Sequence, residues 1–213
     1  ELGMKPVRFM RNVQTLFQEE EDTGYAEPEK WERVLHALMR HLVHRYGRSE
    51  LDSWRMEVWF HESRWEQENA VNEYYELFGR TSRIVKHYSD KLEVGGCGLR
   101  LDFRESWRIA FLEGWGAQDV KPDFLSICYF SYERGEIEKD RYAKRSTDNE
   151  CMKHRILYEK GLIERTGLRE VKLYITEWNL TASARSFIND TCFKGAYVIK
   201  NILDIYGEVA DMA

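Results

Sequence analysis

A glutamate at the end of a strand-like segment is the residue of this sequence best placed to do chemistry. Glu177 follows residues 171–175, an alternating apolar run rich in β-branched and aromatic side chains, which is typical of a strand. An indole and an amide, Trp178 and Asn179, come directly after it. A carboxylate at the tip of a buried strand costs free energy unless it is hydrogen-bonded or used. The segment therefore predicts a catalytic or ligand-binding Glu177, and the simpler interpretation is a glutamate that hydrogen-bonds a loop.

The elements that must position Glu177 alternate between strand and helix along the chain. Helical periodicity of apolar residues predicts helices between the strands, with polar loops over residues 4–25 and 133–149. The expected strands end near residues 3, 59, 95, 130 and 177, and another begins near residue 209. This order predicts a parallel sheet whose units recur every ~30–45 residues, the size of one βα unit of a barrel. No dinucleotide-binding or P-loop motif follows any strand, which disfavours a doubly wound sheet.

The chain is short for a closed barrel, which has eight strands and typically ~250 residues. Its 213 residues predict an incomplete (β/α)8 TIM-barrel-like α/β fold, from about the third strand through the start of the eighth. We expect one domain over residues 1–213 and, because both ends look cut and no initiator methionine is present, a fragment of a longer protein. Open sheet edges predict that it folds stably only with its missing strands or with another copy of itself.

Composition and charge narrow the range of functions. The net charge of −5 gives no basic field, so we expect no nucleic-acid binding by this domain. No apolar run approaches the ~18–20 residues of a membrane span. Four widely spaced cysteines without a CxxC pair predict reduced thiols and a cytoplasmic location. His41 and His44 share a predicted helix but have no evident third ligand, so we expect neither a metal nor a cofactor.

Short motifs along the chain resemble, in their order and spacing, those of glycoside hydrolase family 39, the β-xylosidase family of retaining enzymes. The motifs lie at residues 1–6, 56–59, 74–78, 92–96, 123–126, 175–179 and 190–201. The resemblance implies a (β/α)8 barrel with two catalytic glutamates on opposing strand tips. Such a pair of carboxyl groups lies roughly 5–5.5 Å apart, one as nucleophile and the other as acid/base. Glu177 matches the nucleophile, in the family's ITEWN segment.

The match fails at the partner carboxyl. Where the family has Trp-Asn-Glu-Pro, this chain has Trp59, Phe60, His61 and then Glu62. Aligned without a gap, Phe60 replaces the asparagine that holds a sugar hydroxyl, and His61 replaces the acid/base. Aligned with one inserted residue, Glu62 is the acid/base, but strand side chains alternate in direction, so this alignment requires a local bulge.

A second departure falls on the sixth strand of the family. The pocket histidine of that strand is matched by Cys128 and the following proline by Tyr129. A thiol does not repeat the hydrogen bond of an imidazole with similar strength. A binding pocket would lose less than a catalytic site from these changes, because aromatic side chains still hold a ligand. The aromatic residues that would form such a pocket are Trp59, Phe60, Trp65, Tyr129, Tyr132 and Trp178, and core packing is the simpler interpretation for each.

The leading hypothesis is a hydrolase-like domain that binds a xylose-type sugar or xylo-oligosaccharide without turning it over. Domains resembling this family occur in AraC-type transcriptional regulators, which implies a sugar-sensing role, with the DNA-binding part outside this chain. Contacts to the sugar are expected from Glu177, Glu62, Trp59, Phe60, His61, Cys128, Tyr129, Trp178 and Asn179. The alternative is an active retaining β-xylosidase with Glu177 as nucleophile and Glu62 as acid/base. A third hypothesis is a domain that mainly mediates formation of a homodimer.

Overall fold

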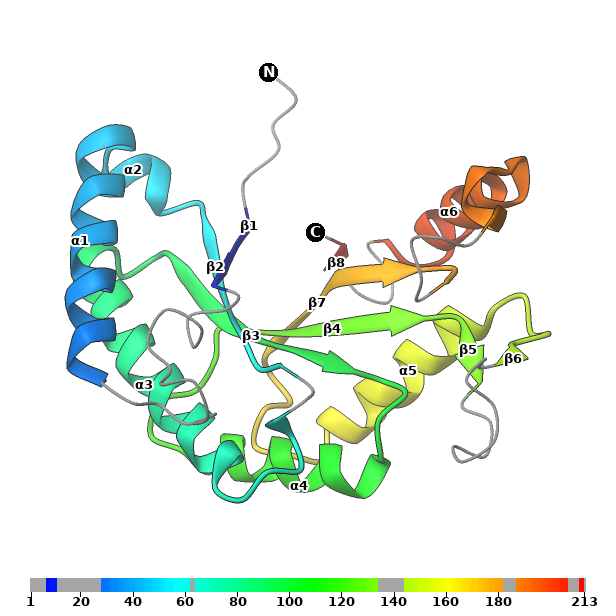
Figure 1. The fold of residues 1–213 in the computed structure, drawn as a ribbon, viewed down its shortest axis with the longest axis horizontal. Helices are drawn as coiled ribbons and strands as arrows, with labels where there is room; N and C mark the ends of the chain where they lie inside the picture. Colours follow the sequence, from blue (N-terminus) through cyan, green and yellow to red (C-terminus); the bar gives the residue numbers. More distant parts are fainter. Residues whose placement is uncertain are drawn as a thin grey trace. The chain divides into compact units, whose positions relative to one another are not determined.

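The computed structural model describes residues 7–10, 28–61, 64–133, 144–181, 187–206 and 211–212. The chain divides into two compact units. The first comprises Glu1–Cys97 and Gly114–Leu125, and the second comprises Gly98–Glu113 and Ser126–Ala213. Each unit is built from strands and helices that alternate along the sequence, as the periodicity predicts (Figure 1). The single domain expected over residues 1–213 stays a prediction.

The strands of the first unit are parallel and follow one another in the sheet. Their order is β1 (Val7–Met10), β2 (Arg55–Trp59), β3 (Glu93–Arg100) and β4 (Phe124–Phe130), the last two of which continue into the second unit. Both β1 and β3 pair with β2 in parallel. Strand β1 lies inside the loop that was predicted over residues 4–25, so that prediction was wrong there. The strand end expected near Gly3 lies outside the described residues.

Two long helices lie side by side in the first unit (Figure 1). They are α1 (Pro28–Tyr46) and α3 (Ala70–Tyr88), and the short α2 (Arg48–Leu51) follows α1. The indole of Trp31 in α1 donates a hydrogen bond of 3.0 Å to Thr81 Oγ1 in α3. Gly47 ends α1 with φ +81°, a conformation that glycine adopts without a Cβ penalty.

Two glycines of β3 allow α3 to pack directly on the strands. A Cβ at Gly96 would lie 2.4 Å from the Val58 carbonyl oxygen and 2.5 Å from the Tyr74 hydroxyl oxygen. A Cβ at Gly95 would lie 2.2 Å from the carbonyl oxygen of Phe124. The space that Gly96 leaves is filled by the Tyr74 hydroxyl, which donates a hydrogen bond of 3.0 Å to the Val58 carbonyl. Strand β3 runs on to Arg100, beyond the strand end that was predicted near residue 95.

The second unit repeats the parallel arrangement with fewer strands. The ends of β3 and β4 are followed in its sheet by β7 (Lys172–Asn179) and β8 (Asp211–Met212), and β8 pairs with β7 in parallel. Strands β5 (Tyr132–Glu133) and β6 (Lys144–Arg145) form a small antiparallel ladder. This ladder lies partly within the polar stretch over residues 133–149 that was predicted as a loop.

A buried ion pair joins two helices of the second unit. Arg108 in α4 (Glu105–Gly116) donates hydrogen bonds of 2.9 and 2.8 Å to the two carboxylate oxygens of Glu159 in α5 (Cys151–Ile163). Both side chains are fully buried. The bidentate geometry is the one in which a buried pair recovers most of its desolvation penalty.

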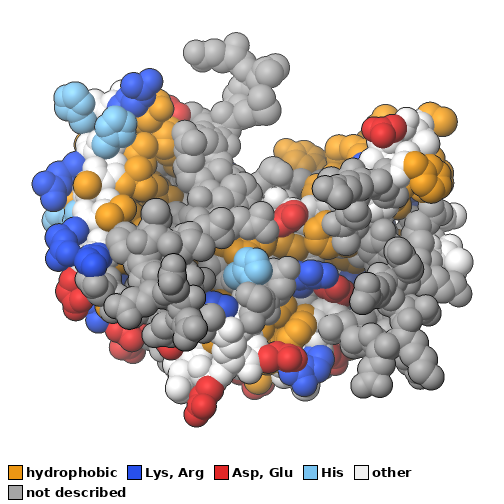
Figure 2. Space-filling model, viewed as in Figure 1, with side chains coloured by type: hydrophobic (Ala, Val, Ile, Leu, Met, Phe, Trp, Pro, Cys, Tyr) orange, Lys and Arg blue, Asp and Glu red, His pale blue; other side chains and the backbone are white. Residues whose placement is uncertain are grey.

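The last described helix has an apolar exposed side. It is α6 (Cys192–Ile205), which the short 3₁₀ helix η3 (Phe187–Asp190) precedes. Thr191 occupies its N-cap position. Orange side chains gather over α6 in Figure 2, and Leu203 and Tyr206 are 76% and 64% exposed. No helix in the described part of the chain combines the length and hydropathy that a bilayer crossing requires.

Candidate functional site

Glu177 lies where β7 changes from buried to partly exposed. Leu173, Tyr174 and Ile175 are buried, whereas residues 176–179 are half-buried. The apolar start of the strand fixes its position in the sheet, and the polar end carries the carboxyl group to a place that a ligand can reach. This is the position on a parallel strand from which barrel enzymes present functional side chains.

A thiol from the neighbouring strand contacts the Glu177 carboxyl. Sγ of Cys128, in β4, lies 3.9 Å from Oε2 of Glu177. Cys128 is buried and forms no disulfide. A thiol is a small and weak donor, so the contact helps to position the carboxyl group and contributes little to stabilising its charge.

Side chains from α6 and β4 form a wall beside the end of β7. The rings of Trp178 and Tyr197 lie with their centroids 6.1 Å apart. The Tyr197 hydroxyl is hydrogen-bonded to the Ser131 hydroxyl, and the Ser131 N–H donates to the carbonyl of Asn179 at 3.4 Å. The side-chain oxygen of Asn179 accepts the N–H of Leu180 at 2.8 Å. Successive side chains of a strand point to opposite faces, so this wall, which holds the Trp178 indole and the Tyr197 phenol, lies on the face of β7 opposite to the Glu177 carboxyl.

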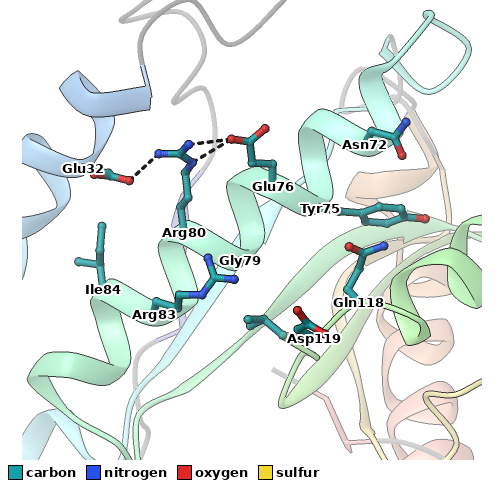
Figure 3. Close-up of a pocket in the computed structure, with 11 residues that line it drawn as sticks. Glu32, Asn72, Tyr75, Glu76, Gly79, Arg80, Arg83, Ile84, Gln118 and Asp119 are labelled. Carbon is teal, nitrogen blue, oxygen red and sulfur yellow. Dashed lines mark hydrogen bonds and ion pairs between the residues drawn. The ribbon is translucent and has the colours of Figure 1, made fainter.

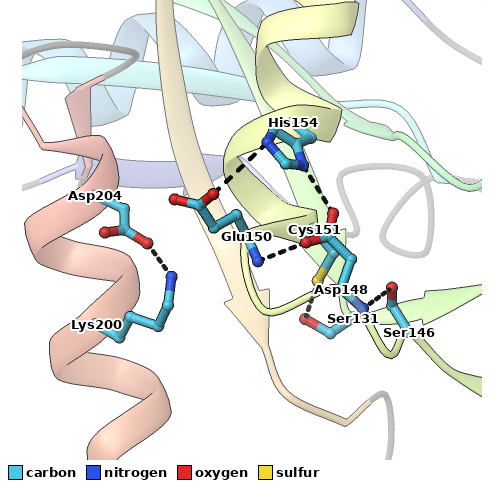
Figure 4. Close-up of polar contacts among 8 residues, drawn as sticks. All are labelled: Ser131, Ser146, Asp148, Glu150, Cys151, His154, Lys200 and Asp204. Carbon is cyan, nitrogen blue, oxygen red and sulfur yellow. Dashed lines mark hydrogen bonds and ion pairs between the residues drawn. The ribbon is translucent and has the colours of Figure 1, made fainter.

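Tyr129 lies behind this wall and is almost entirely buried. Burial raises the pKa of its phenol, and a hydrogen bond with the Cys151 thiol raises it further. Cys151 Sγ also lies 3.8 Å from Ser131 Oγ (Figure 4). The Tyr129 phenol therefore keeps its proton in the folded protein even at a pH where a free tyrosine ionises, and it acts as a neutral hydrogen-bonding group.

An exposed polar cluster caps the start of α5 (Figure 4). Asp148 accepts the N–H of Glu150 at 2.9 Å and contacts His154 Nδ1 at 2.7 Å, and Ser146 Oγ accepts the Asp148 N–H. The hydrogen bond from His154 lowers the pKa of the Asp148 carboxyl. No group of three or more His, Cys, Asp or Glu among the described residues is arranged to hold a metal ion. The cluster is therefore a helix-start structure that satisfies backbone donors.

In the first unit, strand β2 continues its ladder through Phe60. The Phe60 N–H donates to the Cys97 carbonyl at 2.9 Å, and the Phe60 carbonyl accepts the indole N–H of Trp65 at 2.9 Å. The Phe60 ring stacks on Tyr74 of α3 with centroids 4.7 Å apart. Phe60 is thus held by α3 in the core, which does not favour the sugar contact expected of it.

Trp59, the last residue of β2, points the other way from Phe60, because successive side chains of a strand alternate in direction. The pairs from Arg55 with Glu93 to Trp59 with Cys97 are consecutive, with no extra residue in either strand. His61 is half-buried at the end of this ladder. Glu62, the predicted acid/base of the alternative hypothesis, lies outside the described residues.

A family model described as glycosyl hydrolases family 39 matches residues 1–212 of the chain. The chain belongs to glycosyl hydrolase family 39. A β-xylosidase from Geobacillus stearothermophilus is 27% identical over 99% of this chain, and one from Caldicellulosiruptor saccharolyticus is 29% identical over 96% of it. The family 39 chain spans 43% of the length of each of these two relatives.

Solved structures show the fold of this family 39 chain. A monomeric β-xylosidase from Caulobacter crescentus superimposes with a TM-score of 0.72 at 24% identity, covering 90% of this chain and 39% of the other. A family 39 enzyme from Xanthomonas axonopodis gives a TM-score of 0.70 at 24% identity, with 90% and 38% covered. The predicted fold class, a partial TIM-barrel-like α/β fold with a parallel sheet, is confirmed.

The structure brings together only part of the predicted site of the family 39 chain. In the second unit Glu177 contacts Cys128, whereas Trp178 contacts Tyr197, and Asn179 and Tyr129 take part in the adjoining hydrogen bonds. Trp59 ends β2 of the first unit, and Phe60 and His61 follow it. The roles of all these residues in sugar binding or catalysis stay predictions.

Sequence reasoning missed the two residues that complete the wall. Ser131 and Tyr197 are 66 positions apart, and their hydrogen bond is a tertiary contact. The one signal for Ser131 is its place directly after β4, at the same strand edge as Cys128. The signal for Tyr197 is weaker, because a tyrosine in a helix after a strand is usually a packing residue.

Proposed function

We propose that this family 39 domain binds a xylose-type sugar or xylo-oligosaccharide and does not hydrolyse it. The observation that carries the proposal is the contact between Cys128 and Glu177. The resemblance places a pocket histidine where Cys128 stands, and a thiol is a far weaker partner for a carboxylate or a sugar hydroxyl than an imidazole. Glu177 serves as a hydrogen-bond acceptor for sugar hydroxyl groups.

The residues that follow β2 support the loss of turnover. A gapless alignment puts His61 at the acid/base position, and β2 pairs with β3 without an inserted residue as far as Trp59. Loss of a general acid removes about 10²–10⁴ of rate, whereas binding through the remaining polar and aromatic groups is affected less. A non-hydrolysing sugar domain suits a sensor, and we extend the proposal to an AraC-type regulator whose effector is this sugar.

The test is titration of the 213-residue chain with xylose and xylobiose by calorimetry, together with an assay on an aryl β-xyloside. We expect binding without turnover, and we expect Glu177→Gln to weaken binding about tenfold, the effect of losing a hydrogen bond to a charged acceptor. Glu113→Gln, at an exposed glutamate of α4, is the matched control and should bind as the parent does. Hydrolysis that Glu177→Gln abolishes would overturn the proposal.

The second candidate function is that of a retaining β-xylosidase, with Glu177 as nucleophile and Glu62 as acid/base. This function is favoured by the two relatives described above, because both are β-xylosidases. It predicts turnover with retention of configuration and a carboxyl separation near 5–5.5 Å. Loss of activity in Glu62→Gln that azide restores, with formation of a glycosyl azide, would establish it.

The proposed role in an AraC-type regulator has a separate test. A helix-turn-helix pair encoded by the parent gene, together with DNA binding that xylose changes in a mobility-shift assay, would support it. DNA binding that is the same with and without xylose would reject the sensor role but leave the sugar-binding proposal standing.

A further inference from the structure

A groove of about 540 Å³ lies on the outer side of α3 in the first unit (Figure 3). It is lined by one side of α3, by Glu32 of α1 and by the loop of residues 118–120 that follows α4. All eleven lining residues belong to the first unit. The volume falls within the ~300–1,000 Å³ of small-ligand sites. Nothing in the site around Glu177 uses these residues.

The two arginines of the groove differ in how they are paired. Arg80 binds Glu76 at 2.8 Å and Glu32 at 2.9 Å, and these hydrogen bonds raise its pKa. Arg83 has no hydrogen bond or ion pair with any described residue. Its guanidinium lies back over Gly79, where a Cβ would be 3.8 Å from both terminal nitrogens. The Arg83 guanidinium thus lies along α3, at the wall of the groove.

Gln118 and Asp119, from the loop that follows α4, face the same groove as Arg83. Figure 3 shows Arg83 extending from α3 toward the space that Gln118 and Asp119 also face. Asp119 has no ion-pair partner among the described residues, and no ion pair joins it to Arg83. The side-chain amide nitrogen of Gln118 donates a hydrogen bond of 2.9 Å to the Gly114 carbonyl. This bond fixes the side chain and turns its amide oxygen away from that carbonyl. Asn72 adds a second amide from α3.

The charges of the groove select against ionic ligands. Its lining holds two guanidinium groups and three carboxylates, so an anion finds no excess of positive charge. A cation would meet the unpaired guanidinium of Arg83. A neutral ligand with hydroxyl groups meets the hydrogen-bonding needs of both charged side chains. A hydroxyl accepts a hydrogen bond from Arg83 and donates one to Asp119. Ile84, Val120 and the Tyr75 ring supply the apolar contacts that the C–H faces of a sugar ring require.

We propose that this groove is a binding site for a neutral carbohydrate, held by vicinal hydroxyl groups between Arg83 and Asp119. Gln118 and Asn72 bind further hydroxyls through their amides. The site is independent of the sugar binding proposed for Glu177, and it uses a different set of residues.

The test follows the side-chain amide signals of Asn72 and Gln118 in the ¹⁵N-labelled 213-residue chain during titration with xylotriose and with cellotriose. We expect at least one of these neutral sugars to shift both signals at a saturable concentration. Inorganic phosphate serves as the anionic probe and should leave them unchanged. The shifts should persist in Glu177→Gln, which separates this site from the proposed function.

Variants then test whether Arg83 and Asp119 bind the sugar. Arg83→Gln and Asp119→Asn should each weaken binding about tenfold, since each removes a hydrogen bond to a charged group. Arg33→Gln and Asp90→Asn, which change exposed residues outside the groove, should bind as the parent does. All four alter exposed side chains, and coincident thermal melts establish that they are folded. The proposal is overturned if neither sugar shifts the amides, if phosphate shifts them more strongly, or if both groove variants bind like their controls.

Discussion

Two buried titratable side chains lie next to the close contact between α3 and the strands. Burial raises the pKa of the Cys97 thiol, and the Glu57 carboxylate beside it raises that pKa further. Burial also raises the pKa of Tyr74, with smaller contributions from Cys97 and Glu57. Both groups are therefore protonated in the folded protein at a pH where they ionise in the unfolded chain.

These raised pKa values predict that the free energy of unfolding falls as the pH rises above about 8.5, where a free thiol begins to ionise. The unfolded chain releases protons that the folded chain keeps, so the stabilisation is complete at lower pH and is lost in alkali. Urea unfolding at pH 7, 9 and 10.5 measures the slope. Cys97→Ala should make the slope shallower, and Cys192→Ala, at an exposed thiol, should not. Equal slopes in the parent and in both variants would contradict a contribution of the Cys97 thiol to the pH dependence.

Gly96 is the residue at which the absence of a side chain matters most. We expect Gly96→Ala to lower the free energy of unfolding by about 1–3 kcal/mol, because the new Cβ would overlap the Val58 carbonyl and the Tyr74 hydroxyl. Denaturant unfolding measures the change. Gly161→Ala is the control: apart from its own helix backbone and chain neighbours, no described residue lies within 4 Å of the added Cβ, and alanine in the α5 helix should stabilise by ~0.5–1 kcal/mol. Destabilisation of the same size at both positions would refute the steric explanation.

Among the elements, α4 and α5 depend most on a single pair of side chains. Glu159→Ala should cost about 3–5 kcal/mol of stability, because it leaves the Arg108 charge buried without its carboxylate. The double variant Arg108→Met, Glu159→Leu removes both charges and should recover most of that loss. Chemical denaturation of the parent, the single and the double variants gives the comparison. A double variant less stable than the single one would mean that the pair holds the helices through its geometry, not through charge compensation.

The elements also show which features the sequence could predict. Helix α1 begins at Pro28 and is followed by Gly47, and a sequence pattern can carry such boundaries because proline and glycine have strong local preferences. The strand expected to end near residue 95 runs on to Arg100, since glycine content alone does not distinguish the end of a strand from a close approach of α3. At the site, Glu177 was evident from its strand, but the bond between Ser131 and Tyr197 depends on packing that no local pattern encodes.

For the molecule as a whole, the exposed apolar side of α6 is the feature that bears on association. Ile199 is 62% exposed and Leu203 76%, on a helix with few charged side chains. Contiguous apolar surface of this kind promotes association between protein molecules. The homodimer expected from the sequence would have a physical cause in this surface, and it stays a prediction.

We predict that the 213-residue chain self-associates with increasing concentration and that Leu203→Glu shifts it toward the monomer, because burying the new carboxylate in a contact would be costly. Sedimentation velocity over a range of concentrations measures the effect. Leu157→Glu is the matched control, since Leu157 is an exposed leucine of α5. A chain that stays monomeric at all concentrations, or controls that behave like Leu203→Glu, would refute the role of α6.

The glycines of β3 have a consequence for how this sequence can change over generations. Every amino-acid change that one nucleotide substitution makes in a glycine codon introduces a side chain with at least a Cβ. At Gly95 and Gly96 that atom would lie within 2.6 Å of main-chain or ring atoms. Every single mutational step that changes the amino acid at either codon therefore destabilises the fold. In a library of all point variants selected for folding, these two positions should return almost only synonymous codons, while the exposed positions of α1 diversify.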